Sequence, residues 1–257
     1  MGRLEISMSI EVFGKTIQGK RRKQEDNIFY QTRSGVGMAV VCDGMGGLTD
    51  GDWASHIAVQ LMKKHFNKRQ SIDNIPNFYY KEIHHLDEVI CRLEDEKNNQ
   101  IIAGTTYVSA VIEENNLYWA SVGDSKIYIF SNNSLNCVTR AHNYKLRLDD
   151  ELARGVITKE QYDNEQKRAE CLISYLGVGN LEFYDISNEP YILSDGDMVI
   201  LCSDGVSNCL TEEEIFGVIN NCTTVCEIVE QIITKIEIKD LKGQDNASLI
   251  VMRYRAS

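Results

Sequence analysis

Short runs of apolar and β-branched residues recur along most of the chain and predict β-strands. The clearest is Met-Ala-Val-Val-Cys at residues 38–42, and Met-Val-Ile-Leu-Cys at residues 198–202 repeats its character. Residues of these types are enriched in strands, and short continuous apolar runs are typical of buried ones. We expect strands at residues 5–13, 36–42, 105–112, 117–122, 126–130, 135–139, 198–202 and 247–253.

Other segments repeat apolar residues every three or four positions, which is the spacing of an amphipathic helix. The pattern marks residues 52–68, then a helix through Tyr79, Ile83, Leu86, Ile90 and Leu93, and later a pair at residues 212–220 and 223–236. Each predicted helix has one apolar stripe, so each is expected to lie on a sheet.

The order of these elements predicts layered antiparallel sheets. Residues 114–116 (Glu-Asn-Asn) and 131–134 (Ser-Asn-Asn-Ser) are typical of hairpin turns, so we expect an antiparallel meander in the middle of the chain. A doubly wound parallel sheet would require regular alternation of strand and helix. We therefore predict an α+β fold, a four-layer α-β-β-α sandwich in which two antiparallel β-sheets are flanked by helical hairpins.

The chain is expected to form a single domain over residues 1–257. With 257 residues and 43% hydrophobic content it can bury a full core, and it has only two prolines and no Gly/Ser-rich linker. Residues 144–168 are polar and charged with weak helical periodicity. We expect this segment to be an excursion on the surface.

The net charge of −11 argues against nucleic acid as a partner, because a phosphate backbone requires a basic face. No segment approaches the roughly 18 uncharged apolar residues of a membrane span, and the N-terminus has no apolar stretch typical of a signal peptide. We expect a cytoplasmic protein without membrane association. No coiled-coil stripe or extended apolar face remains, which favours a monomer.

Acidic residues stand at the ends of several predicted strands. Asp43 follows the run at residues 38–42 and opens a glycine-rich motif, and Asp204 follows residues 198–202 in the same way. The remaining acidic motifs are Gln24-Glu25-Asp26-Asn27, Gly123-Asp124-Ser125 and Gln244-Asp245-Asn246. Each motif alone fits an ordinary turn. Carboxylates that converge without basic partners repel one another unless a divalent cation neutralises them, so the set indicates a metal centre.

Taken in order, the motifs resemble those of the PPM-type, or type 2C, metal-dependent protein serine/threonine phosphatases in their compact bacterial form. The resemblance covers nearly the whole chain and rests on Gly19-Lys20-Arg21 with Glu25-Asp26, Asp43-Gly44-Met45-Gly46-Gly47 with Gly51 and Ala54-Ser55, Gly104-Thr105-Thr106, Val122-Gly123-Asp124-Ser125, Ser203-Asp204-Gly205, and Asp245-Asn246. It implies hydrolysis of phosphoserine and phosphothreonine in proteins, the products of a serine/threonine kinase. The attacking group would be a hydroxide that bridges two Mn²⁺ or Mg²⁺ ions.

The resemblance also implies roles for individual residues. Two catalytic candidates are Asp43, which would bridge the two ions, and Arg21, whose planar guanidinium would hold the phosphoryl oxygens. The further metal candidates are Glu25 acting largely through water, Asp26 as an outer support, Gly44 through its carbonyl, Asp204 and Asp245 at the second ion, and Asp124, which with Asp204 would hold a weaker third ion. Ligation by oxygen alone suits Mn²⁺ and Mg²⁺.

Three positions depart from the family pattern. Met45 stands where many eukaryotic members have a histidine proposed to protonate the leaving group, and Lys126 replaces the usual arginine after Gly-Asp-Ser. The usual Thr-x-Asp-His-Ser is Thr-Arg-Ala-His-Asn at residues 139–143, so a carboxylate is missing before His142 and the role of this histidine stays open. The resemblance also implies a flap beside the active site, near residues 144–170.

Two alternatives to an active phosphatase follow from the same residues. A catalytically silent relative would bind phosphoproteins or regulate a kinase, but such proteins usually lack metal carboxylates, and Asp43, Asp204 and Asp245 are all present. A two-metal nuclease or other phosphoesterase is disfavoured by the acidic charge and by the order of the motifs. Active hydrolysis is therefore the leading hypothesis.

Overall fold

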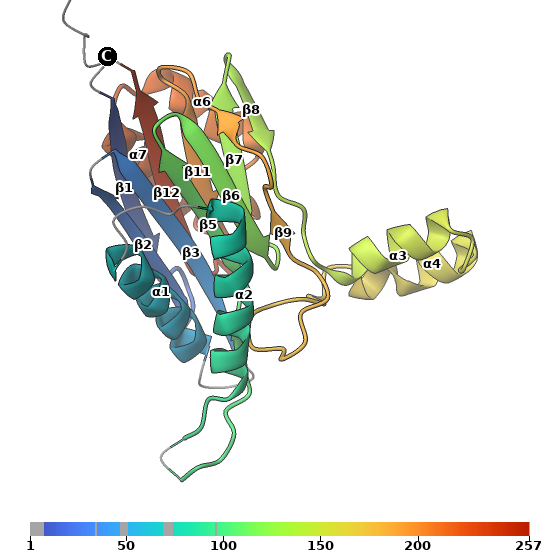
Figure 1. Cartoon of the computed structure of the whole chain (residues 1–257). Helices are drawn as coiled ribbons and strands as arrows, with labels where there is room; N and C mark the ends of the chain where they lie inside the picture. The colour runs from blue at the N-terminus through green and yellow to red at the C-terminus, as the bar shows by residue number, and fades with distance from the viewer. Residues whose placement is uncertain (1–7, 34, 47–50, 69–73, 96, 257) are drawn as a thin grey trace, which may run out of the picture.

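Two antiparallel β-sheets lie face to face, and helices cover both outer faces (Figure 1). The computed structural model describes residues 8–33, 35–46, 51–68, 74–95 and 97–256. In the first sheet the strand order is β1 (Ser9–Ile17), β12 (Ala247–Arg255), β11 (Met198–Cys202), β7 (Lys126–Ser131) and β8 (Ser134–Cys137). In the second it is β10 (Tyr191–Ile192), β6 (Asn116–Val122), β5 (Tyr107–Glu113), β3 (Val36–Gly46) and β2 (Asp26–Arg33), with β4 (Ala103–Thr105) paired to β3 and β9 (Asp185–Ile186) paired to β6.

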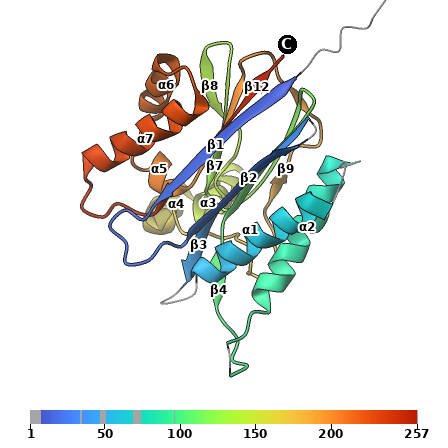
Figure 2. The ribbon, with the colours of Figure 1, turned by 90° about the vertical axis from the view of Figure 1, so that its left-hand side faces the viewer.

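The helices form two hairpins on opposite sides of the sheets, as Figure 2 shows. The second sheet is covered by α1 (Gly51–Lys68) and α2 (Ile75–Cys91), and the first by α6 (Glu212–Asn221) and α7 (Val225–Lys239). The predicted α+β sandwich with flanking helical hairpins is confirmed. No helix in the described ranges is both long enough and apolar enough to cross a membrane.

The predicted surface excursion also takes a helical form. It consists of α3 (Tyr144–Ala153), α4 (Lys159–Glu165) and a 3₁₀ turn (Gln166–Arg168). These elements project from the side of the sandwich, away from both sheets (Figure 1). We call residues 144–170 the flap.

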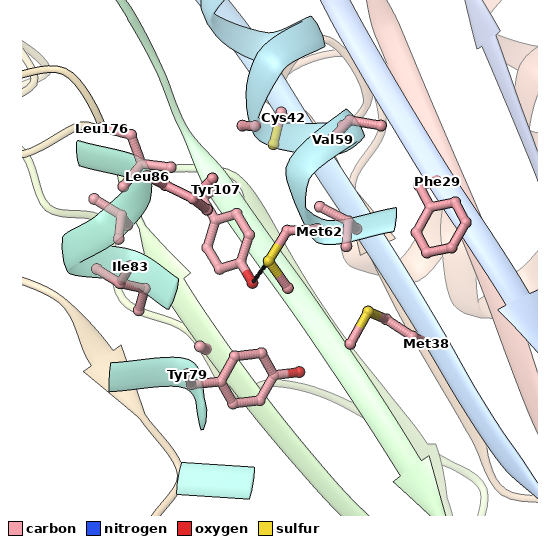
Figure 3. Close-up of a cluster of buried hydrophobic side chains, with 14 of the residues drawn as sticks. Phe29, Met38, Cys42, Val59, Met62, Tyr79, Ile83, Leu86, Tyr107 and Leu176 are labelled. Carbon is pink, nitrogen blue, oxygen red and sulfur yellow. Dashed lines mark hydrogen bonds between the residues drawn. The ribbon is translucent and has the colours of Figure 1, made fainter. Parts of the chain in front are cut away.

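Alternation along the strands explains why the layers stack. On β3, Met38 and Val40 face α1 and α2, whereas Ala39 and Val41 face the other sheet, and all four side chains are fully buried. A strand that is apolar on both faces can be stable only between two layers. Figure 3 shows Met38 and Tyr107 of the second sheet packed beneath Met62 of α1 and the side chains of α2.

The starts of the two late helices are set by local sequence. Thr211 and Glu214 form a capping box at α6, and Thr224 and Glu227 form one at α7. Each box satisfies two backbone N–H groups that a helix start leaves unpaired. The predicted late helix pair is therefore confirmed with starts at Glu212 and Val225.

The predicted meander in the middle of the chain is wrong. The β5–β6 hairpin belongs to the second sheet, whereas the β7–β8 hairpin belongs to the first. The chain crosses between the sheets at residues 123–125, where Gly123 adopts a positive φ of +99°. Two separate hairpins and one continuous meander show the same alternation of apolar and polar residues along their strands. Only the identity of the neighbouring strands distinguishes the two arrangements.

Several strand boundaries also differ from the prediction, including that of β3, which continues to Gly46 rather than ending at Cys42. Residues 26–33 form β2, although their sequence predicts no strand, and the first strand ends at Ile17 rather than at the predicted Phe13. Residues 5–7 of that predicted strand, and Gly47 of the glycine-rich motif, lie outside the described residues. The predicted strand at residues 105–112 is interrupted at Thr106, for a reason found in the site.

Candidate active site

The strand ends bring the predicted carboxylates together at one end of the sandwich. Asp26 opens β2 and is paired in register with Asp43 near the end of β3. Asp204 lies one residue beyond β11, after Ser203, and begins the short helix α5 (Asp204–Ser207). Asp124 lies in the crossing between β6 and β7, and Asp245 precedes β12. The charges of Asp26, Asp204 and Asp124 all act on Asp43, which therefore lies at the centre of the cluster.

Burial and mutual repulsion make these carboxyl groups hold their protons unusually tightly. Burial, followed by the charges of Asp26 and Asp204, raises the pKa of Asp43 well above its usual value. Burial also raises the pKa of Asp26 to about 6 and, with the charge of Asp204, the pKa of Asp124 to about 6. For Asp204 burial and the charge of Asp245 raise the pKa. A site of this kind gains stability from a proton or a metal cation.

Two buried oxygen atoms in the cluster lack a hydrogen-bond partner among the described residues. They are Asp26 Oδ1 and Asp204 Oδ1. The other oxygen of Asp26 accepts a hydrogen bond of 2.8 Å from Ser203 Oγ, so this carboxylate is held in a fixed orientation. Buried carboxylate oxygens without donors are costly, and a cation would satisfy them.

Among the described residues, the carboxylates at the centre of the cluster are not neutralised by direct ion pairs. Within those ranges no lysine or arginine forms an ion pair with Asp26, Asp43 or Asp124. Within the same ranges, no three His, Cys, Asp or Glu side chains are grouped so that they alone could hold a metal ion. An ion held here would therefore need backbone carbonyl or water ligands in addition to carboxylates.

A glycine brings the backbone of two further segments against the cluster. A Cβ at Gly44 would lie 2.2 Å from the carbonyl oxygen of Gly51 and 2.6 Å from that of Glu25. The Gly44 N–H donates to the same Glu25 oxygen at 3.1 Å. Only glycine permits this approach, which places Glu25 and the start of α1 beside the Asp43 motif.

A second glycine joins the two late acidic motifs. A Cβ at Gly205 would lie 1.9 Å from the carbonyl oxygen of Asn246, so any other residue would push the two segments apart. This close contact brings Asp204 next to Asp245 and explains why the charge of Asp245 raises the pKa of Asp204.

Two threonines hold the backbone of Asp43. Its N–H donates to Thr106 Oγ1 at 3.0 Å, and its carbonyl accepts from Thr106 N–H and from Thr105 Oγ1, each at 2.9 Å. These bonds replace the ladder pairing of Thr106 and break the predicted strand into β4 and β5. The Gly-Thr-Thr motif therefore fixes the central carboxylate.

Arg21 lies at the edge of the cluster. Its Nη2 forms an ion pair of 2.5 Å with Asp245 Oδ2, and 57% of its side chain is exposed. Hydrogen bonding to Asp245 and the charge of that group raise the pKa of Arg21. The guanidinium is thus anchored at one nitrogen, which suits binding of an anion from solvent.

Asn246 is a positioning residue to which the sequence analysis assigned no role. Its Nδ2 donates to the carbonyl oxygens of Gln18 (2.8 Å) and Lys23 (3.0 Å), and its Oδ1 accepts from the Glu25 N–H at 2.8 Å. One amide side chain therefore shapes the loop that carries Arg21 and Glu25. The signal in the sequence was the Asp-Asn pair itself.

The whole chain can now be placed by comparison with known proteins. The family model described as "Protein phosphatase 2C" matches residues 10–239. The chain belongs to the protein phosphatase 2C family. The predicted resemblance and enzyme class, a protein serine/threonine phosphatase, are confirmed by this match and by relatives that are named as such phosphatases.

Relatives in this family match along almost their full length. The phosphatase is 29% identical over 243 residues to "Serine/threonine phosphatase stp" of Listeria welshimeri, with 93% of each chain covered. It is 25% identical over 238 residues to "Protein phosphatase PhpP" of Streptococcus pneumoniae, with 90% of each chain covered.

Solved structures show the same fold. The catalytic domain of the serine threonine protein phosphatase PstP, in complex with two manganese ions, superposes with a TM-score of 0.77 at 22% identity, covering 97% of this chain and all of that one. The serine/threonine phosphatase of S. agalactiae gives a TM-score of 0.78 at 23% identity, covering 96% and 99%.

The histidine with an open role connects the phosphatase site to a residue that the sequence analysis missed. His142 is fully buried, its Nδ1 accepts from the Gly123 N–H at 3.1 Å, and its Nε2 lies 3.0 Å from Asp185 Oδ2. A carboxylate thus reaches His142 from β9, 43 positions away, although residue 141 is alanine. No local motif could have indicated this.

The environment of Asp185 keeps its carboxylate ionised. Burial raises the pKa of this group, but hydrogen bonds from His142 and Arg140 outweigh burial and lower the pKa overall. The bond from Arg140 Nε is 2.9 Å long and lies at the surface.

Lys126 and Met45 are the other two positions that depart from the family pattern, and both lie next to residues of the carboxylate cluster. Lys126 begins β7, and its charge partly opposes the rise in the pKa of Asp124. Met45 pairs in register with Gly104, one step beyond Gly44. Both residues of that pair line an open cavity of about 570 Å³ whose other walls include Ile102, Leu172 and Tyr175. An apolar cavity therefore adjoins the carboxylate cluster.

Proposed function

We propose that this phosphatase hydrolyses phosphoserine and phosphothreonine in proteins with the aid of two Mn²⁺ or Mg²⁺ ions. The observation that carries the proposal is the cluster around Asp43, in which raised pKa values coincide with buried, unpartnered oxygens of Asp26 and Asp204. Such a cluster is stabilised by hard cations. The related fold of PstP, which is described with two manganese ions, supports this choice.

The donor atoms of the cluster fit these cations, because all of them are oxygens. Asp43, Asp204 and Asp245 would ligate the ions directly, and the Gly44 carbonyl would add a backbone oxygen. Glu25 would act largely through water. Asp26, whose other oxygen is bound by Ser203, would act as an outer support. When bound, the ions would activate a water molecule as the nucleophile and neutralise charge on the phosphoryl group.

A third, weaker ion would lie between Asp124 and Asp204. The charge of Asp204 contributes to the raised pKa of Asp124, which supports their proximity. Asp124 stands on a turn rather than within a strand, so its position depends on whatever holds that turn.

Arg21 would bind the phosphoryl oxygens of the substrate. Its exposed guanidinium is bound to Asp245 through Nη2, so the phosphate would be held by the remaining N–H groups of the guanidinium. A planar fork binds phosphate in two places, which lysine cannot do.

The substrates would be phosphoproteins made by a serine/threonine kinase. The cavity beside Met45 would take an apolar side chain next to the phosphorylated residue, and the flap would contact the chain beyond it. The acidic charge disfavours nucleic acid. A single domain over residues 1–257, a monomeric state and a cytoplasmic location stay predictions.

The decisive experiment is a metal-dependent phosphatase assay. Purified protein should hydrolyse p-nitrophenyl phosphate and a phosphothreonine peptide with Mn²⁺ stimulation, and Asp43→Asn and Asp204→Asn should abolish turnover. Asp163→Asn on α4 is a matched control, because this exposed carboxylate pairs only with Lys159 among the ion pairs of the described residues. Binding of the phosphopeptide without turnover would instead favour the catalytically silent alternative.

A further inference from the structure

His142 holds both backbone groups of the residue that precedes Asp124. The Gly123 N–H donates to His142 Nδ1 at 3.1 Å, and the His142 N–H donates to the Gly123 carbonyl at 2.9 Å. The imidazole is fully buried, so water does not compete for either bond. One residue therefore fixes the orientation of the peptide groups that lead into Asp124.

The geometry also settles where the proton of the imidazole lies. A backbone N–H can only donate, so Nδ1 of His142 must be unprotonated in order to accept from Gly123. The ring proton is then on Nε2, where it is donated to Asp185 Oδ2 at 3.0 Å. Asp185 thereby selects the tautomer that can bind Gly123. Without an acceptor at Nε2, the tautomer with Nδ1–H would direct a proton at the Gly123 N–H.

The turn at Gly123 needs such support. Gly123 has a φ of +99°, and a Cβ there would lie 2.8 Å from Thr106 Cγ2, so the position is restricted to glycine. Glycine is also the most flexible residue, so the turn depends on outside contacts for a single conformation. Thr106 is the residue that holds Asp43, and its Oγ1 also bonds Ser125 at 2.8 Å.

The same histidine is attached to the base of the flap. The His142 carbonyl accepts from the N–H groups of Ile173 at 3.0 Å and Ser174 at 3.3 Å. The chain that returns from the flap is therefore bonded to the residue that holds the Asp124 turn.

We propose that His142 and Asp185 are positioning residues of the phosphatase: together they hold the Gly123 turn and so direct the Asp124 carboxylate toward its metal ion. The inference rests on the proposed function, because it takes Asp124 as a ligand of the third ion. In this role neither residue would be a ligand of the metal ion or contact the substrate. Their action on catalysis passes through the backbone of Gly123.

The test compares substitutions of Asp185 in the full-length protein. Asp185→Ala removes the acceptor at Nε2, and we expect the Mn²⁺ concentration for half-maximal turnover of p-nitrophenyl phosphate to rise about tenfold, the lower end of the range for outer-shell partners of metal ligands. Asp185→Asn keeps an oxygen that accepts the Nε2–H and should stay within about twofold of the wild type. Arg140→Ala is the control, since it removes only the exposed partner of the same carboxylate.

A second set of variants separates positioning from general damage to the fold. If Asp185 acts through Asp124, Asp185→Ala should add no further shift in Mn²⁺ dependence to Asp124→Asn. A purely structural role would lower the melting temperature of Asp185→Ala without changing its Mn²⁺ dependence. An unchanged Mn²⁺ midpoint, or shifts that multiply in the double variant, would overturn the proposal.

Direct Mn²⁺ binding, followed by the electron paramagnetic resonance signal of free Mn²⁺, makes the test independent of turnover. Asp185→Ala should lose the weakest bound ion, and Asp185→Asn should keep it. If the wild type binds Mn²⁺ in this way but hydrolyses no phosphate ester, the proposed function fails and the inference stands. If Asp185→Ala binds Mn²⁺ as the wild type does, the inference fails and the function stands.

Discussion

Asp43 and Asp124 belong to one carboxylate cluster, but they are held in different ways. Asp43 lies in a long strand that is paired with β2, and two threonines that follow one another in the chain bond its backbone. Asp124 lies in a turn whose conformation depends on a histidine 19 positions from Gly123 and on the distant Asp185. The backbone of Asp43 is therefore held by strand pairing and by one short Thr-Thr motif, whereas the turn at Asp124 is held by two residues, His142 and Asp185, that stand 43 positions apart.

This difference predicts that the two carboxylates respond unequally to substitution. If Asp43 is the ligand shared by both main ions, as proposed, Asp43→Asn should lower kcat/KM by about a thousandfold or more, roughly 4 kcal/mol of transition-state stabilisation. Asp124→Asn should lower kcat/KM by about ten- to a hundredfold, and this loss should become smaller at high Mn²⁺ concentration. Steady-state kinetics over a range of Mn²⁺ concentrations would measure both. Equal losses of kcat/KM in Asp43→Asn and Asp124→Asn at saturating Mn²⁺ would contradict the prediction that the two carboxylates differ.

Arg21, the residue proposed to bind phosphate, belongs to a third part of the site, and its substitution should separate substrate binding from metal binding. Arg21→Ala should raise KM for phosphate esters by about ten- to a hundredfold, because a charge-assisted hydrogen bond contributes about 1.5–3 kcal/mol. Arg21→Lys should restore little of this, since lysine lacks the planar fork.

The Mn²⁺ dependence of the Arg21 variants should stay close to that of the wild type. Lys20→Ala is a suitable control, because Lys20 forms an exposed ion pair with Asp240 in the same loop region. Unchanged phosphate-ester kinetics in Arg21→Ala would exclude the assigned role.

The sequence predicted the Asp43 side of the site better than the Asp124 side. Asp43 follows an apolar run directly and Asp204 follows one after Ser203, so a carboxylate near a strand end can be recognised from neighbouring residues alone, although β3 continues past Asp43 to Gly46. Strand β2 was not predicted because its apolar residues are few and lie among polar ones. Its pairing with β3 nevertheless puts Asp26 opposite Asp43.

On the Asp124 side, the interactions that decide the structure are not local. The crossing between the sheets depends on which strands accept β6 and β7, and this cannot be read from alternation that both sheets share. Asp185 stands in a strand of two residues after a segment without periodicity. Its bond to His142 joins positions 43 residues apart, so only the folded chain identifies it.

The raised pKa values give the cluster a distinct effect on stability in the metal-free protein. Carboxyl groups with pKa values near 6 in the folded state, such as Asp26 and Asp124, keep protons that the unfolded chain releases near its ordinary value. The folded state then binds more protons, so the free energy of unfolding falls as pH rises from about 4 to about 7. The melting temperature of protein treated with a chelator should therefore drop by several degrees, about 3–8 °C, between about pH 5 and about pH 7.5.

The Asp43→Asn substitution tests how much Asp43 contributes to the pH dependence of the melting temperature. Metal-free Asp43→Asn lacks one repelling charge, so its melting temperature should fall less than that of the wild type over the same pH interval. The exposed Asp163→Asn should follow the wild type. Parallel curves for wild type and Asp43→Asn would show that the cluster is not the source of the pH dependence.

The smallest effect is expected at the apolar cavity, which adjoins the carboxylate cluster through the Met45 and Gly104 pair. Ile102 lines this cavity with 87% of its surface exposed, so Ile102→Asp should leave the fold intact. If the cavity holds the side chain beside the phosphorylated residue, KM should rise about three- to tenfold for a phosphothreonine peptide with an apolar neighbour, in keeping with partial loss of apolar burial. p-Nitrophenyl phosphate and a peptide with a glycine neighbour should be unaffected, because neither reaches the cavity. An equal change for all three substrates would instead mean that the substitution acts on the carboxylate cluster through β4 and β3.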